Sequence, residues 1–225
     1  MSVLVYAEEF NGKFAKSTLE AVSYARELSN SLGTELRALC SGNFEEGELR
    51  TLSNYGANKV LVSDKVCKAD GGMIASLIEK QINDSDIIVF ASTNTTKMIS
   101  PRLAVKLSAG VANNVVETPS SITPFIVKKK SFSGKAYENI EIKTDKKIIS
   151  IAPNSYGAVE SIQEHILEEI DFSCDSNIII DGEEVISGKI NLSEANIIVS
   201  AGRGMKDPKN WDMIEELANL LEAAT

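Results

Sequence analysis

The sequence predicts an α/β protein with a mostly parallel, doubly wound, Rossmann-like sheet, an added antiparallel hairpin, and an incomplete second β-α unit. Three observations carry this prediction. Short apolar runs alternate with segments of helical period through the first 110 residues, and the connections are only a few residues long. A stretch without helical period follows, and a fresh β-loop-α pattern begins near residue 188. Such alternation implies parallel strands with helices on both faces of the sheet.

The alternating part is expected to contain four strands and four helices. The strands are buried apolar runs at residues 3–7, 36–40, 59–62 and 87–91. The helices have apolar residues at three-to-four spacing and cover residues 17–32, 44–55, 72–82 and a segment that runs to Ser108. Gly33 and Gly56 stand where helix-ending glycines are expected. Because proline favours the first turn of a helix, we expect Pro101 near the start of the last helix.

The hairpin is predicted after Ile122, where helical periodicity stops. Residues 125–127, 136–142 and 147–152 resemble strands and are separated by the turn signals Ser133-Gly134 and Thr144-Asp145. Further along, we expect a helix over residues 156–170 and extended chain over residues 177–186. Lys128, Lys129 and Lys130 begin the hairpin. They suit a solvated sheet edge that resists aggregation, or a contact patch for an acidic partner.

A second unit is expected to begin around Ser187-Gly188-Lys189. A strand-like run at residues 197–200 is followed by a Gly-Arg-Gly loop and by a helix from about Asn210 to Ala224. We therefore divide the chain into an N-terminal α/β domain, residues 1–187, and the opening β-α unit of a second domain, residues 188–225. A lone β-α unit cannot bury both faces of its strand, so this unit needs neighbours.

Composition excludes several classes of function. The 225 residues carry a net charge of −9 and have a pI near 4.8. Acidic surfaces repel nucleic acids and anionic membranes. The cysteines Cys40, Cys67 and Cys174 are widely spaced and match no metal-binding pattern, which suits a reducing compartment. There is no apolar run of the roughly 20 residues that a membrane span needs, and no targeting segment is recognisable. We expect a cytoplasmic protein, or one already processed, with no membrane insertion.

The loop Gly202, Arg203 and Gly204 is the main candidate for ligand binding. It connects an expected strand to an expected helix, which places it at the carboxyl edge of a parallel sheet, where ligands usually bind. Glycines permit positive φ angles and close approach, arginine supplies a fixed charge, and the next helix offers its positive N-terminus. The loop suits an anionic or electron-rich ligand. A tight turn with an exposed arginine explains these three residues about as well.

Other candidate sites are weaker. The segment Ser92-Thr-Asn-Thr-Thr96 follows a strand in the same topological position and could hold a phosphate, but such residues are also common in loops and helix caps. There is no glycine-rich phosphate motif. His165 lies between Glu164 and Glu168 on an expected helix and is interpreted as a surface residue. No catalytic or metal-binding group of residues can be assembled from the sequence.

Three segments resemble the alpha subunits of electron transfer flavoproteins. The first is Val3-Leu-Val-Tyr-Ala-Glu8, followed by Gly12 and Ser17-Thr-Leu-Glu20. The second is Ile87-Ile-Val-Phe-Ala-Ser92, followed by Ser100-Pro-Arg-Leu-Ala104, which resembles a helix start. The third and most specific contains Leu192-Ser-Glu-Ala, Ile197-Ile-Val-Ser, Gly202-Arg-Gly-Met-Lys206, Trp211 and Glu216-Leu-Ala-Asn-Leu-Leu221. These matches occur in order over nearly the whole chain.

The resemblance implies an electron carrier subunit rather than an enzyme with its own substrate. Members of the family form heterodimers of alpha and beta subunits that carry FAD. They collect electrons from dehydrogenases, commonly the acyl-CoA dehydrogenases of fatty acid oxidation, and pass them to a membrane oxidoreductase or another acceptor. Gly202, Arg203 and Gly204 match a loop at the family's flavin site, which implies a partial FAD site.

The sequence also departs from the family. Most family contacts to FAD come after the Leu-Ala-x-x-Leu helix, in Ser-Arg-Ala, Gly-Gln-Thr-Gly and Gly-x-Ser-Gly-Ala-x-x-His segments that this sequence lacks. The chain is then a fragment of a longer alpha subunit or a short relative that has lost flavin. We expect FAD in the intact family complex and little binding by this chain alone. A flavin-free partner module of the same fold, or a nucleotide-binding α/β protein that uses Ser92–Thr96, remain alternatives.

Overall fold

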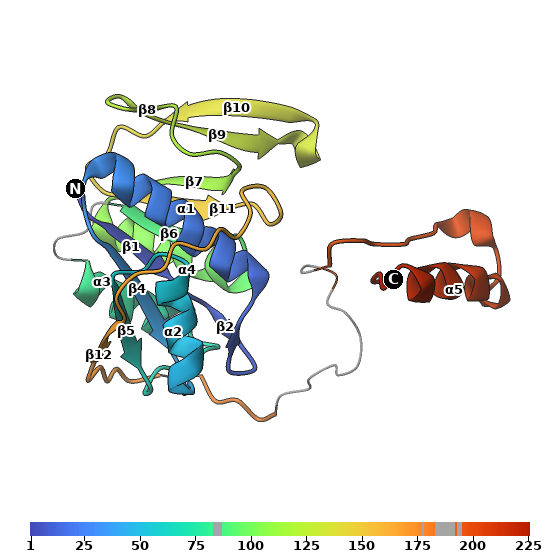
Figure 1. Ribbon diagram of the computed structural model, residues 1–225, viewed down its shortest axis with the longest axis horizontal. Coiled ribbons are helices and arrows are strands. Elements are labelled where there is room, and N and C mark those ends of the chain that lie inside the picture. Colours follow the sequence, from blue (N-terminus) through green and yellow to red (C-terminus); the bar gives the residue numbers. More distant parts are fainter. Residues whose placement is uncertain (83–86, 177, 183–191, 193–194) are drawn as a thin grey trace. The chain divides into compact units, whose positions relative to one another are not determined.

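The computed structural model describes residues 1–82, 87–176, 178–182, 192 and 195–225 (Figure 1). These residues form two compact units, Met1–Ile179 and Ile180–Thr225, and each is described here by itself. The boundary predicted between residues 187 and 188 lies outside the described residues. None of the helices in the described part is long and apolar enough to cross a membrane.

A ten-stranded, mainly parallel sheet forms the centre of the first unit, which confirms the predicted fold class. Its strand order is β10-β9-β7-β11-β6-β1-β4-β5-β12, and β8 pairs with β9. The parallel strands are β7 (Gly110–Val115), β11 (Lys147–Ile151), β6 (Ile87–Ala91), β1 (Val3–Tyr6), β4 (Leu36–Ser41), β5 (Lys59–Ser63) and β12 (Ile166–Glu169). The chain reverses its direction of strand addition between β1 and β6, so the topological switch point lies there.

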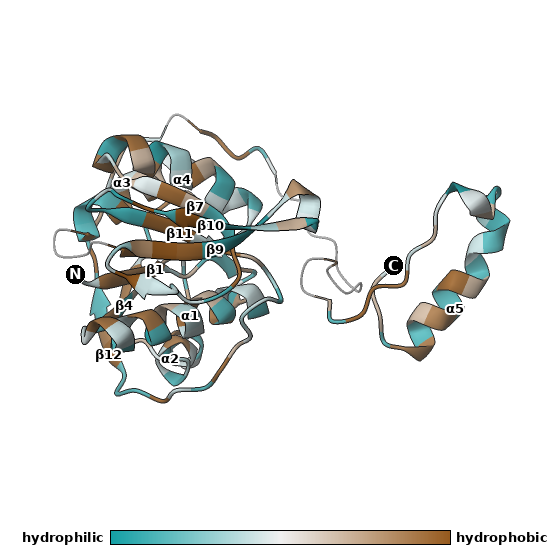
Figure 2. Cartoon of the chain, turned by 90° about the horizontal axis from the view of Figure 1, so that it is seen from above, coloured by the Kyte–Doolittle hydropathy of each residue, from teal (hydrophilic) through white to brown (hydrophobic). Residues whose placement is uncertain are grey.

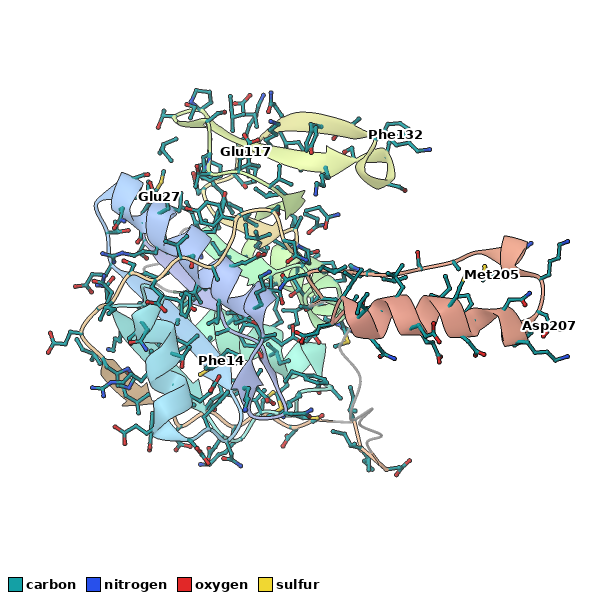
Figure 3. The ribbon with its side chains drawn as sticks, turned by 45° about the vertical axis from the view of Figure 1, so that its right-hand side comes forward. Phe14, Glu27, Glu117, Phe132, Met205 and Asp207 are labelled. Carbon is teal, nitrogen blue, oxygen red and sulfur yellow. The ribbon has the colours of Figure 1, made fainter. Side chains whose placement is uncertain are left out.

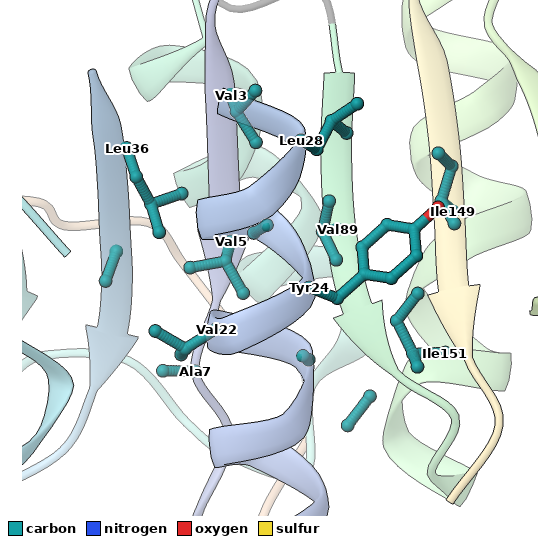
Figure 4. Packing of buried hydrophobic residues seen from close by; sticks show 14 of the residues in the cluster. Val3, Val5, Ala7, Val22, Tyr24, Leu28, Leu36, Val89, Ile149 and Ile151 are labelled. Carbon is teal, nitrogen blue, oxygen red and sulfur yellow. The ribbon is translucent and has the colours of Figure 1, made fainter. Parts of the chain in front are cut away.

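Helices cover both faces of this sheet. Helices α1 (Lys16–Leu32) and α2 (Glu46–Asn54) pack on one face, and α3 (Gly71–Gln81) and α4 (Asn94–Leu107) pack on the other (Figure 2). Alternate residues of β1 point to opposite faces, because Val3 and Val5 join the core under α1 while Leu4 joins the core under α3 and α4. In Figure 4, Tyr24 of α1 lies over the strands β6 and β11. The central strands β1 and β6 are apolar throughout because both of their faces are buried.

Helix α4 starts earlier than expected. The Thr93 side chain accepts a hydrogen bond from the N–H of Thr96 at 3.1 Å and caps the helix, which begins at Asn94. Pro101 therefore lies inside the helix rather than in its first turn. Buried Ile99 and Leu103 hold the helix against the sheet on either side of the proline. The expected helix start at Pro101 is wrong because a threonine cap precedes it by eight residues.

The predicted hairpin is confirmed as β9 (Phe125–Ser131) and β10 (Ala136–Glu141), which pair in antiparallel register at one edge of the sheet. Strand β8 (Ser121–Ile122) pairs with β9. Strand β7 was not expected from the sequence, nor was a small separate sheet of β2 (Glu9–Phe10) and β3 (Lys13–Phe14). Strand β7 has a mixed sequence with only Ala112 and Val115 buried, so it lacks the apolar run that marks its neighbours.

The helix expected over residues 156–170 is wrong. The chain crosses α1 and α2 without regular structure and then forms β12, which pairs with β5 at the other edge of the sheet. The backbone N–H groups of Ser161 and Gln163 donate to the carbonyls of Asn54 and Ser53 at 2.8 and 3.0 Å. These bonds satisfy carbonyls at the end of α2, so tertiary contacts override the local helical pattern. Of the extension expected over residues 177–186, only residues 178–182 are described, and they have no regular structure.

The second unit contains one helix, α5 (Asp212–Leu220), among its described residues. The strand expected at residues 197–200 is limited to a parallel bridge between Ile198 and Ala224. The expected helix over residues 210–224 is shorter, because residues Pro208–Trp211 form a 3₁₀ turn. Ile198 and Leu220 are 53% and 81% exposed. This exposure agrees with the argument that a lone strand and helix cannot bury their apolar residues.

Candidate functional site

The Gly-Arg-Gly loop is an exposed 3₁₀ turn in the second unit. Arg203–Met205 form the turn, in which Met205 N–H donates to the Gly202 carbonyl at 3.1 Å and Lys206 N–H donates to the Arg203 carbonyl at 3.1 Å. Gly202, Arg203 and Gly204 are all exposed. The loop therefore presents its backbone and a guanidinium group to solvent.

The backbone of this loop does not itself require glycine. Gly202 has a φ angle of −113°, and neither it nor Gly204 is among the glycines with positive φ. A Cβ atom added at either position would meet nothing within 4 Å. The sequence suggested two uses for these glycines, a positive φ angle and close approach of a ligand. The structure shows no positive φ angle, so close approach is the use that remains.

The helix after this loop does not add its N-terminus to the site, contrary to expectation. Helix α5 begins only at Asp212, after a separate 3₁₀ turn that the Asp207 carboxylate caps by accepting from the N–H of Lys209 at 3.0 Å. Asp212 and Glu215 lie in the first turn of α5, where their negative charges interact favourably with the positive end of the helix dipole. The positive charge of the loop thus comes from Arg203 and Lys206. In the described part of the chain, neither side chain forms an ion pair.

The switch point of the first unit lies between Glu8, after β1, and Thr93, after β6. The Thr93 hydroxyl donates to the Glu8 carboxylate and is 3.0 Å from the hydroxyl of Thr96. Thr96 in turn donates to the Ala91 carbonyl at 2.6 Å. These hydroxyls hold the start of α4 in place, and the Glu8 carboxylate would repel a phosphate beside Thr93. The geometry of residues 92–96 supports the capping interpretation rather than the phosphate site.

The first unit also has two surface hollows. One, of about 450 Å³, is lined by apolar residues that include Phe44 and Leu167 and by the acidic residues Asp64, Glu169 and Asp171. Lys65 donates to Asp171 at 2.6 Å, and this hydrogen bond holds the pKa of the Asp171 carboxyl below its usual value. The other, of about 650 Å³, lies beside the hairpin tip around Phe132 (Figure 3). It is lined by Lys129, Lys130 and small or polar residues.

His165 is half-buried rather than on an exposed helix face. Its Nδ1 atom is 2.9 Å from the Ser53 hydroxyl, and its Nε2 atom is buried without a hydrogen-bond partner among the described residues. Ser53 is fully buried, so a substrate cannot reach its hydroxyl. The pair fastens residues 156–165 to the end of α2. In the described part of the chain, no group of His, Cys, Asp and Glu side chains could hold a metal ion.

The three hairpin lysines do not lie on an edge strand. Lys128, Lys129 and Lys130 belong to β9, which β10 covers on its outer side. Lys128 donates to Glu117 at 2.7 Å, which raises the pKa of the lysine, and its ammonium group lies 5.0 Å from the centre of the Tyr137 ring. Protection of a sheet edge therefore falls to β10, and the role of these lysines as a contact patch stays a prediction.

Comparison with known proteins relates both units to one family. Residues 3–171 match the electron transfer flavoprotein domain, and residues 191–225 match the electron transfer flavoprotein FAD-binding domain. An electron transfer flavoprotein subunit alpha of Bacillus subtilis is 32% identical over 99% of this chain and 70% of its own length. One from Pseudomonas aeruginosa is 28% identical over 100% of this chain and 72% of its own length. The lactate dehydrogenase (NAD(+),ferredoxin) subunit LctC of Acetobacterium woodii is 29% identical over 98% of this chain and 56% of its own length.

Proposed function

Because the chain belongs to the electron transfer flavoprotein alpha subunit family, we propose that it works as the alpha subunit of an FAD-carrying electron transfer flavoprotein. An electron transfer role follows from the family. The observation that carries the FAD proposal is the match of residues 191–225 to the FAD-binding domain, in which the exposed loop Gly202, Arg203 and Gly204 lies.

The chemistry of this loop fits FAD. FAD has an anionic diphosphate and an electron-rich ring system. When bound, it would accept and release electrons reversibly. Arg203 offers planar N–H donors and a permanent positive charge, while the open backbone at Gly202 and Gly204 leaves room for an anionic group to approach. The role of these residues is to bind and orient. They form part of a site, and we propose that other segments of the complex complete it.

The proposed partners are a beta subunit and dehydrogenases that donate electrons. Acyl-CoA dehydrogenases of fatty acid oxidation are the proposed donors, and the cytoplasm is the proposed location. The name of the Acetobacterium relative makes a lactate dehydrogenase an alternative donor. We also propose two domains, residues 1–187 and 188–225. The two family matches support this division because the first ends at residue 171 and the second begins at residue 191, on either side of the proposed boundary.

Co-expression with the beta subunit tests the proposal. The purified complex is expected to show flavin absorbance and to release FAD on denaturation. Mixing it anaerobically with an acyl-CoA dehydrogenase and its substrate should bleach the flavin bands, and a lactate dehydrogenase with lactate provides the comparison for the alternative donor. A complex that forms without flavin supports the flavin-free partner module instead. Release of a nucleotide other than FAD supports the nucleotide-binding alternative.

A further inference from the structure

Lys206 has an unusual backbone conformation at the end of the Gly-Arg-Gly turn. Its φ and ψ angles are 65° and −55°, and the Asp207 N–H donates across it to the Met205 carbonyl at 2.7 Å. This is a γ-turn, which is rare and strained for a residue with a side chain. The Asn210 amide also donates to the Met205 carbonyl at 2.7 Å and holds the turn. Met205 and Asp207, which flank Lys206, are labelled in Figure 3.

The turn brings a second cation next to Arg203. Lys206 closes the 3₁₀ turn by donating its N–H to the Arg203 carbonyl, so the two cationic residues are separated by a single turn of chain. The nearest acidic residue in the sequence, Asp207, directs its carboxylate to the N–H of Lys209. Within the described residues, the two side chains carry charges that no ion pair neutralises.

The two glycines of the loop differ from other glycines of the chain in backbone angle and in the space around them. Gly33 is needed for its left-handed φ of 64°, and a Cβ atom at Gly110 would come within 2.6 Å of Ile142. Gly202 and Gly204 have neither requirement. A ligand that approaches the backbone closely would give a reason for glycine at these two positions.

We propose that Lys206 is a binding residue for the diphosphate of FAD, and that Gly202 and Gly204 admit the phosphate oxygens to the backbone of the turn. The inference rests on the proposed function, because it requires FAD in the complex. It assigns a part of the ligand to a residue outside the Gly-Arg-Gly motif. Two cations and backbone N–H groups on a short turn match the charge and hydrogen-bonding needs of a diphosphate.

The lysine is tested by Lys206→Gln in the complex with the beta subunit, after removal of flavin. Loss of a charge-assisted contact is expected to weaken FAD binding by about 10- to 100-fold. Binding should also depend less on salt than in the wild type, because one cation–phosphate contact is missing. Riboflavin, which has no phosphate, is the second probe, and any affinity for it should not change. Lys209→Gln, with the same charge change three residues further on, is the matched control and should bind FAD as the wild type does.

The glycines are tested by Gly202→Ala and Gly204→Ala, with Gly47→Ala as the control. A Cβ atom meets nothing within 4 Å at any of the three positions. We expect all three variants to melt at or above the wild-type temperature and only the first two to lose FAD affinity. A lower melting temperature for either of them, measured without flavin, means that the glycine has a structural role and contradicts the proposal for that position.

The outcomes separate this inference from the function on which it rests. A wild-type complex without FAD contradicts the proposed function. A wild-type complex with FAD, together with a Lys206→Gln variant of equal affinity and salt dependence, contradicts the inference alone. Equal losses in Lys206→Gln and Lys209→Gln also contradict it, because they indicate a general effect of net charge.

Discussion

At the scale of single residues, Arg203 is an exposed, permanently charged residue in a turn with two glycines that have open space around them. A solvent-exposed turn arginine without a ligand is the competing explanation. Substitution distinguishes the two because arginine and lysine share a charge but differ in hydrogen-bond geometry.

We expect Arg203→Ala to weaken FAD retention or to lower the flavin reduction potential in the alpha–beta complex. Loss of a positive charge near the ring disfavours the reduced, more negative form, whereas loss of a phosphate contact affects retention alone. Arg203→Lys should preserve a pure charge effect and lose a bidentate or stacked contact. Flavin content and redox titration are the measurements. If the wild type and both variants have the same flavin content and the same reduction potential, the arginine is an ordinary turn residue.

Asp70 is a second residue whose role follows from its contacts. Its carboxylate caps α3 by accepting from the N–H groups of Gly72 and Met73 at 2.8 and 3.1 Å, and the Ser176 hydroxyl donates to it at 2.7 Å. The Ser176 bond is the largest cause that holds the pKa of this carboxyl below its usual value, and the bonds from Met73 and Gly72 add to it. The ionised form is therefore the form that stabilises the fold.

Asp70→Ala is expected to lower the free energy of unfolding by about 1 kcal/mol at neutral pH, as is typical for loss of an N-cap. Because the folded pKa is depressed, the stabilisation is complete above the unfolded value of about 3.9 and is lost as the pH falls through the folded value. Thermal melts at pH 7 and pH 3 should show the difference between wild type and variant shrinking in acid. A difference that stays constant with pH would contradict this assignment.

At the scale of elements, helix α4 contains an apparent contradiction, since Pro101 lies in its interior. A proline there cannot donate a hydrogen bond to the carbonyl four residues earlier, which belongs to Lys97. Pro101 is exposed and contributes little packing, so the helix itself gains nothing from it.

Pro101→Ala is expected to stabilise the protein, by about 1–3 kcal/mol, because alanine restores the missing bond and removes the clash in the helix. Pro208→Ala is the control. Pro208 stands in the first turn of a 3₁₀ helix, where proline has no bond to lose, and its replacement should give no gain. Urea unfolding of the two variants measures both effects. An unchanged or lower stability of Pro101→Ala would indicate that the proline is needed for the shape of α4.

The same elements show what the sequence could and could not predict. Strands such as β6 were predictable because burial on both faces makes their sequences apolar throughout. Strand β7 was not, because most of its residues are polar or exposed, and β12 was mistaken for helix because its partner β5 lies about a hundred residues earlier. The sequence made the loop at residues 202–204 a candidate site, which stays a prediction, but the γ-turn at Lys206 and the open space around the glycines needed coordinates.

At the scale of the whole molecule, the two units should separate on limited proteolysis. The first unit contains the complete sheet with its two cores, and the family matches leave residues 172–190 between them. We expect cleavage near residues 187–192 and a stable N-terminal product, identified by mass spectrometry. Rapid cleavage within residues 87–108, which hold β6 and α4, would contradict a first domain that ends at about residue 187.

The 225-residue chain alone is expected to bind FAD more weakly than about 1 μM. A dissociation constant of 1 μM requires about 8 kcal/mol, and charge-assisted contacts such as those proposed for Arg203 and Lys206 contribute about 1.5–3 kcal/mol each. Fluorescence titration of this chain with FAD is the measurement. Submicromolar affinity would mean that residues beyond this loop also bind the flavin.

The strand order has a consequence for synthesis on the ribosome. Strand β11 fills the place between β6 and β7, but it is made after both of them, and its last residue follows the end of β6 by 60 positions, from Ala91 to Ile151. At about 5–20 residues per second, that interval lasts roughly 3–12 s. During this time the apolar edge of β6 has no partner, and the edge of β7 has none from the moment β7 is made until β11 follows. Such edges recruit other chains, so slower growth at low temperature or a chaperone that covers them should increase the soluble yield.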